Sequence, residues 1–452
     1  MTPIAPARKL PLPPSPPRPP LVGHIGAYLR DPLTYCEAVA REYGDVVRLR
    51  LGPFDDYLIR HPDHIEYVLR VHHENYWKDR ITKLLRPLVG DGLLTSEGAF
   101  WRRQRKLVQP GFQHDRIASY GEAMVACTER VLDQWEPGRP ITLQEDMARI
   151  TLAIVSRCLF ESDVDEAAEV VGESLAVIMD RFLDPTKWIP LSDYLPLPGT
   201  FRYWRAIRRI DEVVYKIIRQ RREQGGQGDL LGRLLAERDD EGGRMTDRQL
   251  RDEVVTLFLA GHETTALALT YTLHLLARHP EVEARLIGEI DGVLGQGEGR
   301  LVAGDVARLP YTEAVVRESM RLYPPAWSIG REALHDDEVG GFRAPRGTQF
   351  TVAIWLAHRD ERWFDDPASF RPERWGGDFL KRLPRCAYMP FGGGPRICIG
   401  NHFAMMELVL VLGTILSRYR MERADEAPIE VLPSITLRPK SPVRMIPRSR
   451  RD

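Results

Sequence analysis

The sequence predicts a mainly α-helical protein with a small β-sheet region, built around one large core. Apolar residues recur at helical spacing through most of the chain. A strict alternation of apolar and charged residues is confined to a short stretch that begins at Val46, so the sheet is expected to be small. No linker that would separate domains follows the first 20 residues. We therefore expect residues 21–452 to form a single domain.

The first 20 residues are expected to form a proline-rich arm. The run Pro11–Pro20 reads PLPPSPPRPP, and proline cannot continue a helix because it lacks the N–H donor. An extended polyproline segment is therefore expected, with a ligand for a proline-recognition module as the alternative. Because the arm lacks the apolar region of a signal peptide, neither a targeting segment nor a membrane anchor is expected.

The elements of the domain follow from periodicity. Residues 46–59 alternate between apolar and charged side chains and turn at Gly52-Pro53, which predicts a hairpin. A second strand-like patch runs through residues 350–354 and includes Ile354. Helical spacing predicts helices over 115–135, 145–160, 201–222, 247–278, 312–322 and 402–418.

The composition favours a soluble, cytoplasmic protein. The 452 residues include 63 Lys and Arg against 64 Asp and Glu, so the chain lacks the net positive charge that binds nucleic acid or an anionic membrane. The longest apolar runs, 254–260 and 408–412, are shorter than the roughly 18 residues of a transmembrane span. The five cysteines form no CxxC pair, which argues against a disulfide framework or a structural zinc site.

One cysteine lies in an unusual loop. Residues 391–400 read FGGGPRICIG and lead into a helix that starts near His402. Glycine and proline prevent helix formation before Cys398 and impose a tight bend. The N–H groups at a helix start favour a thiolate, which is a strong donor for a haem iron. The other four cysteines are interpreted as small buried hydrophobic residues.

The pattern F-x-x-G-x-R-x-C-x-G over residues 391–400 resembles the haem-binding loop of the cytochrome P450 family. The resemblance implies that Cys398 is the axial ligand of haem b (iron protoporphyrin IX). It also implies that Phe391 packs beside the thiolate, that Arg396 pairs with a haem propionate, and that Gly400 belongs to the cofactor-binding loop. The haem is then expected between the long central helix and the helix after the loop.

A second motif is E-x-x-R. Glu318 and Arg321 are three residues apart and share a helix face, although an isolated pair of this kind is usually a solvated surface bridge. Residues 370–375, FRPERW, stand between this helix and the cysteine loop. In the family such a segment joins the pair, which implies a buried network of Glu318, Arg321 and Arg374. Trp375 stands where the family commonly has Phe.

The helix that begins after Thr246 is expected to be the central one. Thr246 and Gln249 form a capping box, and the pattern continues to Arg278, a length of about 50 Å. Its middle, residues 260–265, reads AGHETT. Gly261 weakens a helix interior, so a bulge or kink is expected where a ligand approaches.

The string AGHETT also resembles the A-G-x-[DE]-T-T motif of the same family. The resemblance implies that Glu263 and Thr264 relay protons to dioxygen, as an acid and an alcohol positioned for general acid catalysis. His262 fills the variable position, and no chemistry is assigned to it.

Basic residues supply the remaining cofactor contacts. Trp101 and Arg105 lie one helical turn apart, and in the family this pair binds haem propionates. Arg331 matches a further propionate-binding arginine, and Lys83 is a weaker candidate. The remaining basic residues of that helix, Arg102, Arg103 and Lys106, are interpreted as a face that docks an acidic electron-transfer protein.

Together the motifs imply a haem monooxygenase of the soluble bacterial type, most similar to the fatty-acid-hydroxylase-like branch. It is expected to insert one atom of O₂ into a hydrophobic lipid, terpenoid, steroid or polyketide, by hydroxylation or epoxidation. Electrons are expected from a separate ferredoxin and reductase. By analogy of position, the substrate pocket is expected to include Leu85, Leu88, Val89, Leu259, Ala260, Ala326, Trp327, Ile329 and Ile435, a largely apolar set.

Two other functions are compatible with the cysteine loop. A haem-thiolate enzyme that uses peroxide needs no reductase, but such members usually have a changed acid–alcohol pair, and here the pair Glu263-Thr264 is intact. A non-catalytic haem sensor would need the loop without that pair. The intact pair therefore favours the monooxygenase.

Overall fold

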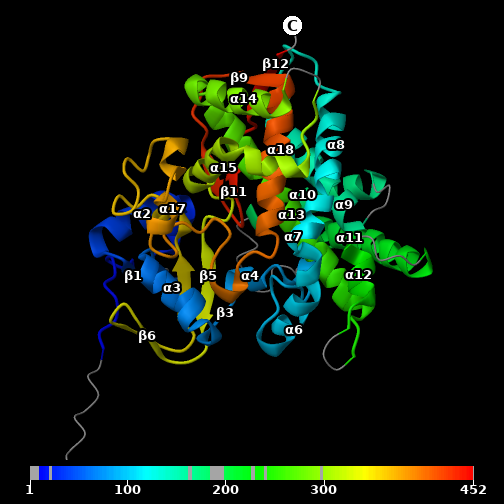
Figure 1. Ribbon diagram of the computed structural model, residues 1–452. Helices are drawn as coiled ribbons and strands as arrows, with labels where there is room; N and C mark the ends of the chain where they lie inside the picture. Colours follow the sequence, from blue (N-terminus) through cyan, green and yellow to red (C-terminus); the bar gives the residue numbers. More distant parts are fainter. Residues whose placement is uncertain are drawn as a thin grey trace, which may run out of the picture. The chain divides into compact units, whose positions relative to one another are not determined.

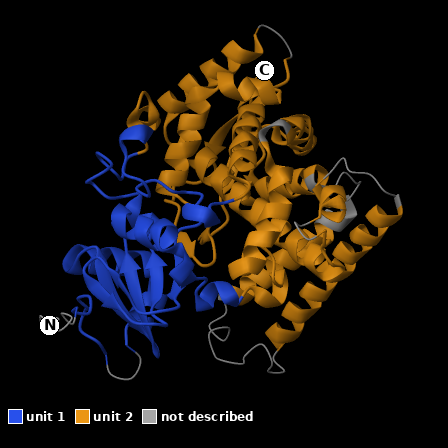
Figure 2. Cartoon of the chain, turned by 60° about the horizontal axis from the view of Figure 1, so that its bottom comes forward, with its two compact units in different colours: residues 1–84, 326–369, 380–398 blue, residues 85–325, 370–379, 399–452 orange. Residues whose placement is uncertain are grey.

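The computed structural model describes residues 10–19, 23–160, 165–183, 198–224, 230–238, 242–295 and 299–450. The chain divides into two compact units, coloured blue and orange in Figure 2. Unit 1 contains residues 1–84, 326–369 and 380–398, and unit 2 contains residues 85–325, 370–379 and 399–452. Helices dominate and the sheets are small, which confirms the predicted fold class. The single domain of residues 21–452 stays a prediction.

Unit 1 is built on a five-stranded sheet of order β1-β2-β8-β5-β3. Strands β2 and β8 are parallel, and the other neighbours are antiparallel. Figure 1 shows that blue and yellow strands, from distant parts of the sequence, both belong to this region. Its strands are β1 Val46–Leu51, β2 Phe54–Ile59, β3 Tyr76–Trp77, β5 Ile329–Ala333 and β8 Gln349–Val352. Strands β6 Asp337–Val339 and β7 Phe342–Ala344 form a separate two-stranded sheet. The helices are α1 Ile25–Arg30, α2 Pro32–Tyr43, α3 Pro62–Glu66, the π-helix η1 Tyr67–Val71, η2 His73–Asn75, α4 Arg80–Lys83, α16 Ile354–Ala357 and η8 Gly394–Arg396.

The predicted hairpin is confirmed. Strands β1 and β2 pair from Val46 opposite Ile59 to Leu51 opposite Phe54. The second predicted strand is β8, but it ends at Val352, and Ile354 begins α16. The expectation that the strand extends to Ile354 was therefore wrong. The backbone of Ala353 already leaves the extended conformation, with ψ of 81°.

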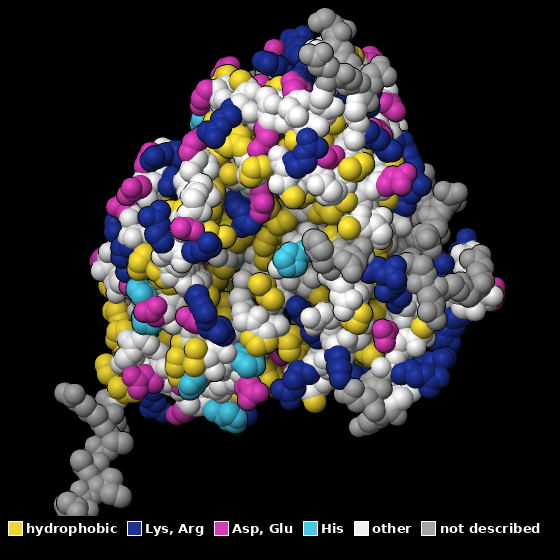
Figure 3. All heavy atoms as spheres, in the orientation of Figure 1, with side chains coloured by type: hydrophobic (Ala, Val, Ile, Leu, Met, Phe, Trp, Pro, Cys, Tyr) yellow, Lys and Arg dark blue, Asp and Glu magenta, His cyan; other side chains and the backbone are white. Residues whose placement is uncertain are grey.

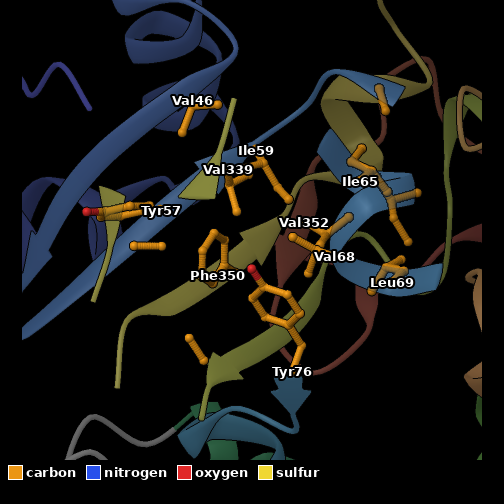
Figure 4. Close-up of a cluster of buried hydrophobic side chains, with 14 of the residues drawn as sticks. Val46, Tyr57, Ile59, Ile65, Val68, Leu69, Tyr76, Val339, Phe350 and Val352 are labelled. Atoms are coloured by element: carbon orange, nitrogen blue, oxygen red, sulfur yellow. The ribbon is translucent and has the colours of Figure 1, made fainter. Parts of the chain in front are cut away.

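An aromatic cluster forms the centre of unit 1 (Figure 4). The ring of Phe350, from β8, meets the rings of Tyr57 and Tyr76 edge-on, at centroid distances of 5.4 and 5.3 Å. Val68 and Leu69 of η1 belong to the same cluster. Edge-to-face aromatic pairs add stability beyond the apolar area that they bury, and η1 packs against this cluster through Val68 and Leu69.

The proline-rich segment is held to unit 1 by its carbonyl groups. The carbonyl of Pro14 accepts the N–H of Arg48 on β1 at 2.8 Å, and that of Pro11 accepts the N–H of Arg343 on β7 at 2.9 Å. Proline keeps its acceptor although it has no N–H donor. Residues 10–19 can therefore pair with strand edges without forming a ladder.

Unit 2 is a set of helices around α13. This helix, Asp247–Leu276, packs against α9, α11, α15 and α18. The other helices are α5 Arg86–Val89, α6 Gly98–Val108, η3 Gln109–Phe112, α7 His114–Ser119, α8 Gly121–Leu132, α9 Leu143–Phe160, α10 Asp165–Leu183, α11 Pro198–Gln224, α12 Leu230–Ala236, α14 Pro280–Leu294, η6 Ala303–Arg308, α15 Pro310–Leu322, η7 Pro372–Trp375 and α18 Asn401–Arg418. Helix α17, Phe379–Arg382, spans the boundary between the units. The short strands are β4 Ile141–Thr142, β9 Tyr419–Arg423, β10 Val431–Pro433, β11 Leu437–Pro439 and β12 Arg444–Ser449.

The start of α13 confirms the predicted capping box. The N–H of Gln249 donates to Oγ1 of Thr246 at 3.3 Å, and the N–H of Thr246 donates to Oε1 of Gln249 at 2.8 Å. Two N–H groups at the helix start are thereby satisfied. Within the described residues, no helix combines the length and the apolar character that crossing a bilayer requires. Basic and acidic side chains are interspersed on the face shown in Figure 3.

Candidate active site

The cysteine loop is a tight turn of unit 1. The N–H of Cys398 donates to the carbonyl of Phe391 at 2.9 Å, which closes the loop around η8. Gly394 has a φ of +68°, and a Cβ there would lie 1.9 Å from the carbonyl oxygen of Leu69. Only glycine accommodates both this conformation and this contact. The glycines of the motif therefore bring the loop directly onto η1.

Cys398 is the exposed cysteine of the chain. Cys36, Cys127 and Cys158 are buried and Cys386 is half-buried. Burial raises the pKa of the Cys36 and Cys158 thiols and raises the pKa of Cys386 to about 11, so these thiols stay protonated. An exposed thiol in a loop of small residues fits the single axial donor that a haem requires.

Helix α18 begins at Asn401, with Gly400 as its N-cap, so Cys398 stands two residues before the cap. Phe391 and Arg396 are half-buried in the same loop. Arg331 is buried on β5 and donates from Nη1 to the carbonyl of Gly330 at 2.8 Å. Unit 1 thus supplies the cysteine and two of the predicted propionate-binding residues.

The weaker candidate, Lys83, is engaged elsewhere. Its Nζ lies 2.9 Å from Oε2 of Glu332, next to Arg331 on β5. The pair is partly exposed, so it contributes little stability. It nevertheless gives the Lys83 ammonium a protein partner.

Helix α6 presents the predicted pair Trp101 and Arg105. Trp101 is buried and Arg105 is half-buried, while Arg102 and Lys106 on the same helix are exposed. Gln104, which the sequence analysis did not single out, is fully buried and donates from Nε2 to Oε1 of Glu253 at 3.2 Å. The helix therefore separates an inner face from a basic outer face, as the spacing predicts.

Glu263 is held by a C-terminal strand. Its Oε1 accepts from Oγ1 of Thr436 at 3.0 Å and forms an ion pair with Arg438 on β11. The hydroxyl of Thr264 donates to the carbonyl of Ala260 at 2.6 Å, within the helix. Among the described contacts, the side chains of Glu263 and Thr264 make no hydrogen bond to each other. The sequence analysis missed Arg438, since nothing in local spacing links it to a residue 175 positions earlier.

Gly261 makes a helix contact that the sequence analysis did not expect. Helix α13 runs as an α-helix over Asp247–Leu276, so the expected bulge is absent, while the alternative, a kink, stays a prediction. A Cβ on Gly261 would lie 2.8 Å from Cγ2 of Val155 on α9. The glycine therefore permits the close approach of two helices. Its neighbour His262 is half-buried, and desolvation lowers its pKa to about 4, so it is neutral at physiological pH.

The E-x-x-R network forms as the resemblance implies. Glu318 and Arg321 are fully buried and joined by two hydrogen bonds of 2.9 and 2.8 Å. Oε1 of Glu318 also accepts from Nε of Arg374 at 2.9 Å. Nε1 of Trp375 donates to Oε2 of Glu318 at 2.9 Å, a contact that phenylalanine could not make. The sequence analysis noted only that Trp375 stands where the family commonly has Phe, and missed this bond.

The predicted pocket residues fall into both units. Leu85, Leu88, Val89 and Leu259 are buried in unit 2, where α5 packs against α13. Ala260 is exposed, although the ten residues before it on α13 are all buried. The others are Ile435, half-buried in unit 2, and Ala326, Trp327 and Ile329 in unit 1. The structure thus brings the α5 and α13 candidates together.

Comparison with known proteins gives consistent matches. A family model described as "Cytochrome P450" matches residues 13–446. The chain is 38% identical over 442 residues to cyclooctatin synthase of Streptomyces melanosporofaciens, covering 95% of this chain and 94% of that protein. It is 38% identical over 407 residues to cyclooctat-9-en-7-ol 5-monooxygenase of the same organism, covering 89% and 88%. The crystal structure of the cytochrome P450DA heme domain matches with a TM-score of 0.88 at 27% identity, covering 98% of this chain and 99% of that one.

Proposed function

Because the chain belongs to the cytochrome P450 family, we propose that it is a haem b monooxygenase whose substrate is a terpenoid. The reaction inserts one atom of O₂ into a hydrophobic small molecule. The observation that carries the proposal is the exposed Cys398 thiol in a closed glycine loop, while the other four cysteines are buried or half-buried. When bound, the haem supplies the activation of dioxygen.

We assign the cofactor contacts residue by residue. Cys398 is the thiolate ligand, and its loop is fixed by the Cys398–Phe391 hydrogen bond and by the contact of Gly394 with η1. A fixed donor loses little conformational entropy on binding its ligand. The other residues proposed to contact the haem are Trp101, Arg105, Arg331, Phe391, Arg396 and Gly400. The buried network of Glu318, Arg321 and Arg374 supports the fold of unit 2, where it joins α15 to η7.

Proton delivery is assigned to Glu263 and Thr264. Arg438 and Thr436 fix the carboxylate of Glu263. The hydroxyl of Thr264 donates to Ala260, which leaves its oxygen free to accept from a second donor. Thr264 can therefore orient a proton donor, while Glu263 supplies an ionisable group next to it in sequence.

The relay is tested by Thr264→Ala. We expect reductant consumption to continue while product per electron pair falls by about tenfold or more, since positioned proton transfer contributes factors of this size or larger. Thr270→Ala is the matched control, because its hydroxyl also donates within α13, to the carbonyl of Ala266 at 2.7 Å. Unchanged coupling in Thr264→Ala would remove Thr264 from the relay.

The haem ligand is tested by the absorbance of the reduced, CO-bound protein. The wild type should show the strongly red-shifted Soret band of a thiolate ligand, and Cys398→His should lose it. Cys386→Ser should keep the band, since that thiol is half-buried and stays protonated. A red-shifted band in Cys398→His would show that another group is the ligand.

The substrate class follows from two observations. The candidate residues on α5 and α13 are aliphatic and largely buried, as in pockets for apolar ligands. A relative at 38% identity is named for an unsaturated alcohol, cyclooctat-9-en-7-ol. We expect cyclic terpenoids to give a substrate-induced haem spin shift at lower concentration than fatty acids of equal carbon number. The reverse order would favour a fatty-acid hydroxylase.

Electrons are proposed to come from a separate ferredoxin and reductase. Arg102 and Lys106 are exposed on α6, and a basic face attracts an acidic partner mainly by raising the association rate. Reconstitution with NADH, ferredoxin, reductase and ¹⁸O₂ should place one ¹⁸O atom in the product. Product without label would contradict the monooxygenase reaction. If charge reversal at Arg102 and Lys106 leaves the rate of electron transfer unchanged, this docking face is excluded.

A further inference from the structure

The loop between α5 and α6 is tied to α13 by two adjacent carboxylates. The N–H of Asp91 donates to Oδ2 of Asp252 at 2.9 Å. The N–H of Leu93 donates to Oε2 of Glu253 at 3.1 Å. Nε2 of Gln104, on α6, donates to the other oxygen of Glu253 at 3.2 Å. Two consecutive acidic residues of one helix therefore hold both the loop and the helix that follows it.

The loop lies directly on α13. A Cβ on Gly90 would lie 2.1 Å from the carboxylate of Asp252, and a Cβ on Gly92 would lie 2.2 Å from Oγ1 of Thr256. Real side chains do not approach this closely, so positions 90 and 92 have room only for glycine. The hydroxyl of Thr95 donates to the carbonyl of Gly90 at 2.6 Å and closes the loop on itself.

The two carboxylates differ in their charged neighbours. Asp252 accepts from Nη1 of Arg251 at 2.9 Å, and Arg251 in turn pairs with Asp211 on α11. Glu253 is fully buried and meets two neutral donors and the like charge of Asp252. Its pKa is raised to about 8, first by burial, and the repulsion from Asp252 adds to the effect. Glu253 therefore remains largely protonated at neutral pH.

Other charged groups near the loop also have hydrogen-bond partners there. Asp91 pairs with Arg86 on α5, with 2.6 Å between Nη2 and Oδ1. Nη1 of Arg103 on α6 donates to Oε1 of Gln104 at 3.3 Å. Glu253 is the carboxyl of this cluster whose pKa burial raises into the neutral range.

We propose that residues 90–96 form a proton-linked latch on α13, which neutral Glu253 holds closed and ionised Glu253 releases. Ionised Glu253 is unfavourable in the closed loop because it is buried beside Asp252, whereas an opened loop admits water to the carboxylate. Closing therefore takes up a proton. The latch follows directly after Leu88 and Val89, so on the proposed function it controls entry to the substrate pocket.

The expected pH dependence of loop closing follows from the linkage between proton binding and the closing equilibrium. The closed loop binds the proton up to about pH 8, and an opened loop binds it only up to the ordinary value of about 4.5. Between these values the closing equilibrium should fall by up to tenfold for each pH unit. Above about pH 8 it should level off, because Glu253 is then ionised in both states.

Hydrogen–deuterium exchange of the holoenzyme tests the latch itself. The amides of Asp91 and Leu93 should lose protection between pH 5 and about pH 8, after each rate is divided by the intrinsic exchange rate at that pH. Glu253→Gln should make the protection independent of pH. The matched control is Glu283→Gln on α14, another buried carboxyl with a raised pKa, which should behave as the wild type. Protection that does not change with pH in the wild type, or a pH dependence that persists in Glu253→Gln, would overturn the proposal.

A second variant covers the case in which Glu253→Gln does not fold. Gln104→Leu removes one donor that favours the ionised form of Glu253, so the pH at which protection levels off should rise. An unchanged pH profile in Gln104→Leu would count against the latch.

A neutral triazole ligand of the haem, fluconazole, tests whether the latch gates entry. Its association rate should rise with pH over the same range in the wild type and stay constant in Glu253→Gln. A constant rate in the wild type, with exchange that still changes, would overturn the gating role. A protein that binds no azole because it lacks haem would contradict the proposed function, while the exchange experiment would still report on the latch.

Discussion

Replacing Gly261 with alanine tests whether helix contact, and not ligand approach, determines this position. In an exposed helix interior, Gly→Ala gains about 1 kcal/mol of stability, because alanine loses less backbone entropy on folding. Here the added Cβ would lie 2.8 Å from Cγ2 of Val155. Val155 is buried and its branched side chain has one preferred rotamer in a helix. Overpacking of this kind costs about 1–3 kcal/mol, so Gly261→Ala should be neutral or destabilise by up to about 2 kcal/mol.

Urea unfolding followed by circular dichroism provides the measurement, and Gly288→Ala provides the matched control. Gly288 lies within α14, and its added Cβ would meet nothing within 4 Å, so this change should stabilise by about 1 kcal/mol. In a Val155→Ala background the clash is absent, and Gly261→Ala should then also stabilise. If Gly261→Ala stabilises the wild type as much as Gly288→Ala does, the contact with Val155 does not explain the glycine.

Two further changes test buried polar groups in unit 2. Trp375→Phe removes the indole donor to Glu318 and should lower the free energy of unfolding by about 1.5 kcal/mol, since hydrogen bonds to charged groups are worth roughly this much or more. The matched control is Trp363→Phe, because the buried indole nitrogen of Trp363 has no hydrogen-bond partner in the described structure. This control should leave the free energy of unfolding unchanged, and an equal loss in both variants would refute the role of the Trp375 bond. Burial raises the pKa of Glu407 well above its usual range, and Thr265 offsets this only in part. The folded state thus holds a proton that the unfolded state releases above about pH 4.5, so the free energy of unfolding falls as pH rises. Compared with the wild type, Glu407→Gln should raise the urea midpoint at pH 8 and leave it unchanged near pH 4. If wild type and variant have equal midpoints at both pH values, this reasoning is wrong.

Local patterns predicted the fold class and the cysteine loop well. The capping box of Thr246, the hairpin turn at Gly52 and the glycines before Cys398 act over a few residues. Such features determine backbone conformation independently of the rest of the chain. The end of β8 was placed too late because apolar Ile354 suits a strand as well as a helix start. Single apolar residues at element ends carry little information.

The missed contacts all join residues far apart in the sequence. Arg438 reaches Glu263 from β11, and Trp375 reaches Glu318 from η7. Neither pair has a spacing that indicates contact, because both depend on how separate elements pack. The helix contact of Gly261 was missed for the same reason, since a missing side chain does not reveal which helix takes its place.

The acidic residues of α13 show why the charge state of a buried carboxyl depends on its partners. Glu253 and Glu263 are both buried on this helix. Arg438 gives Glu263 a cation, which compensates the cost of removing a carboxylate from water. Glu253 has only neutral donors and the nearby charge of Asp252, so protonation is its less costly state. One helix thus places an acid with a cationic partner at the proposed proton relay and an acid without one beneath the loop, and the cationic partner is Arg438 on β11.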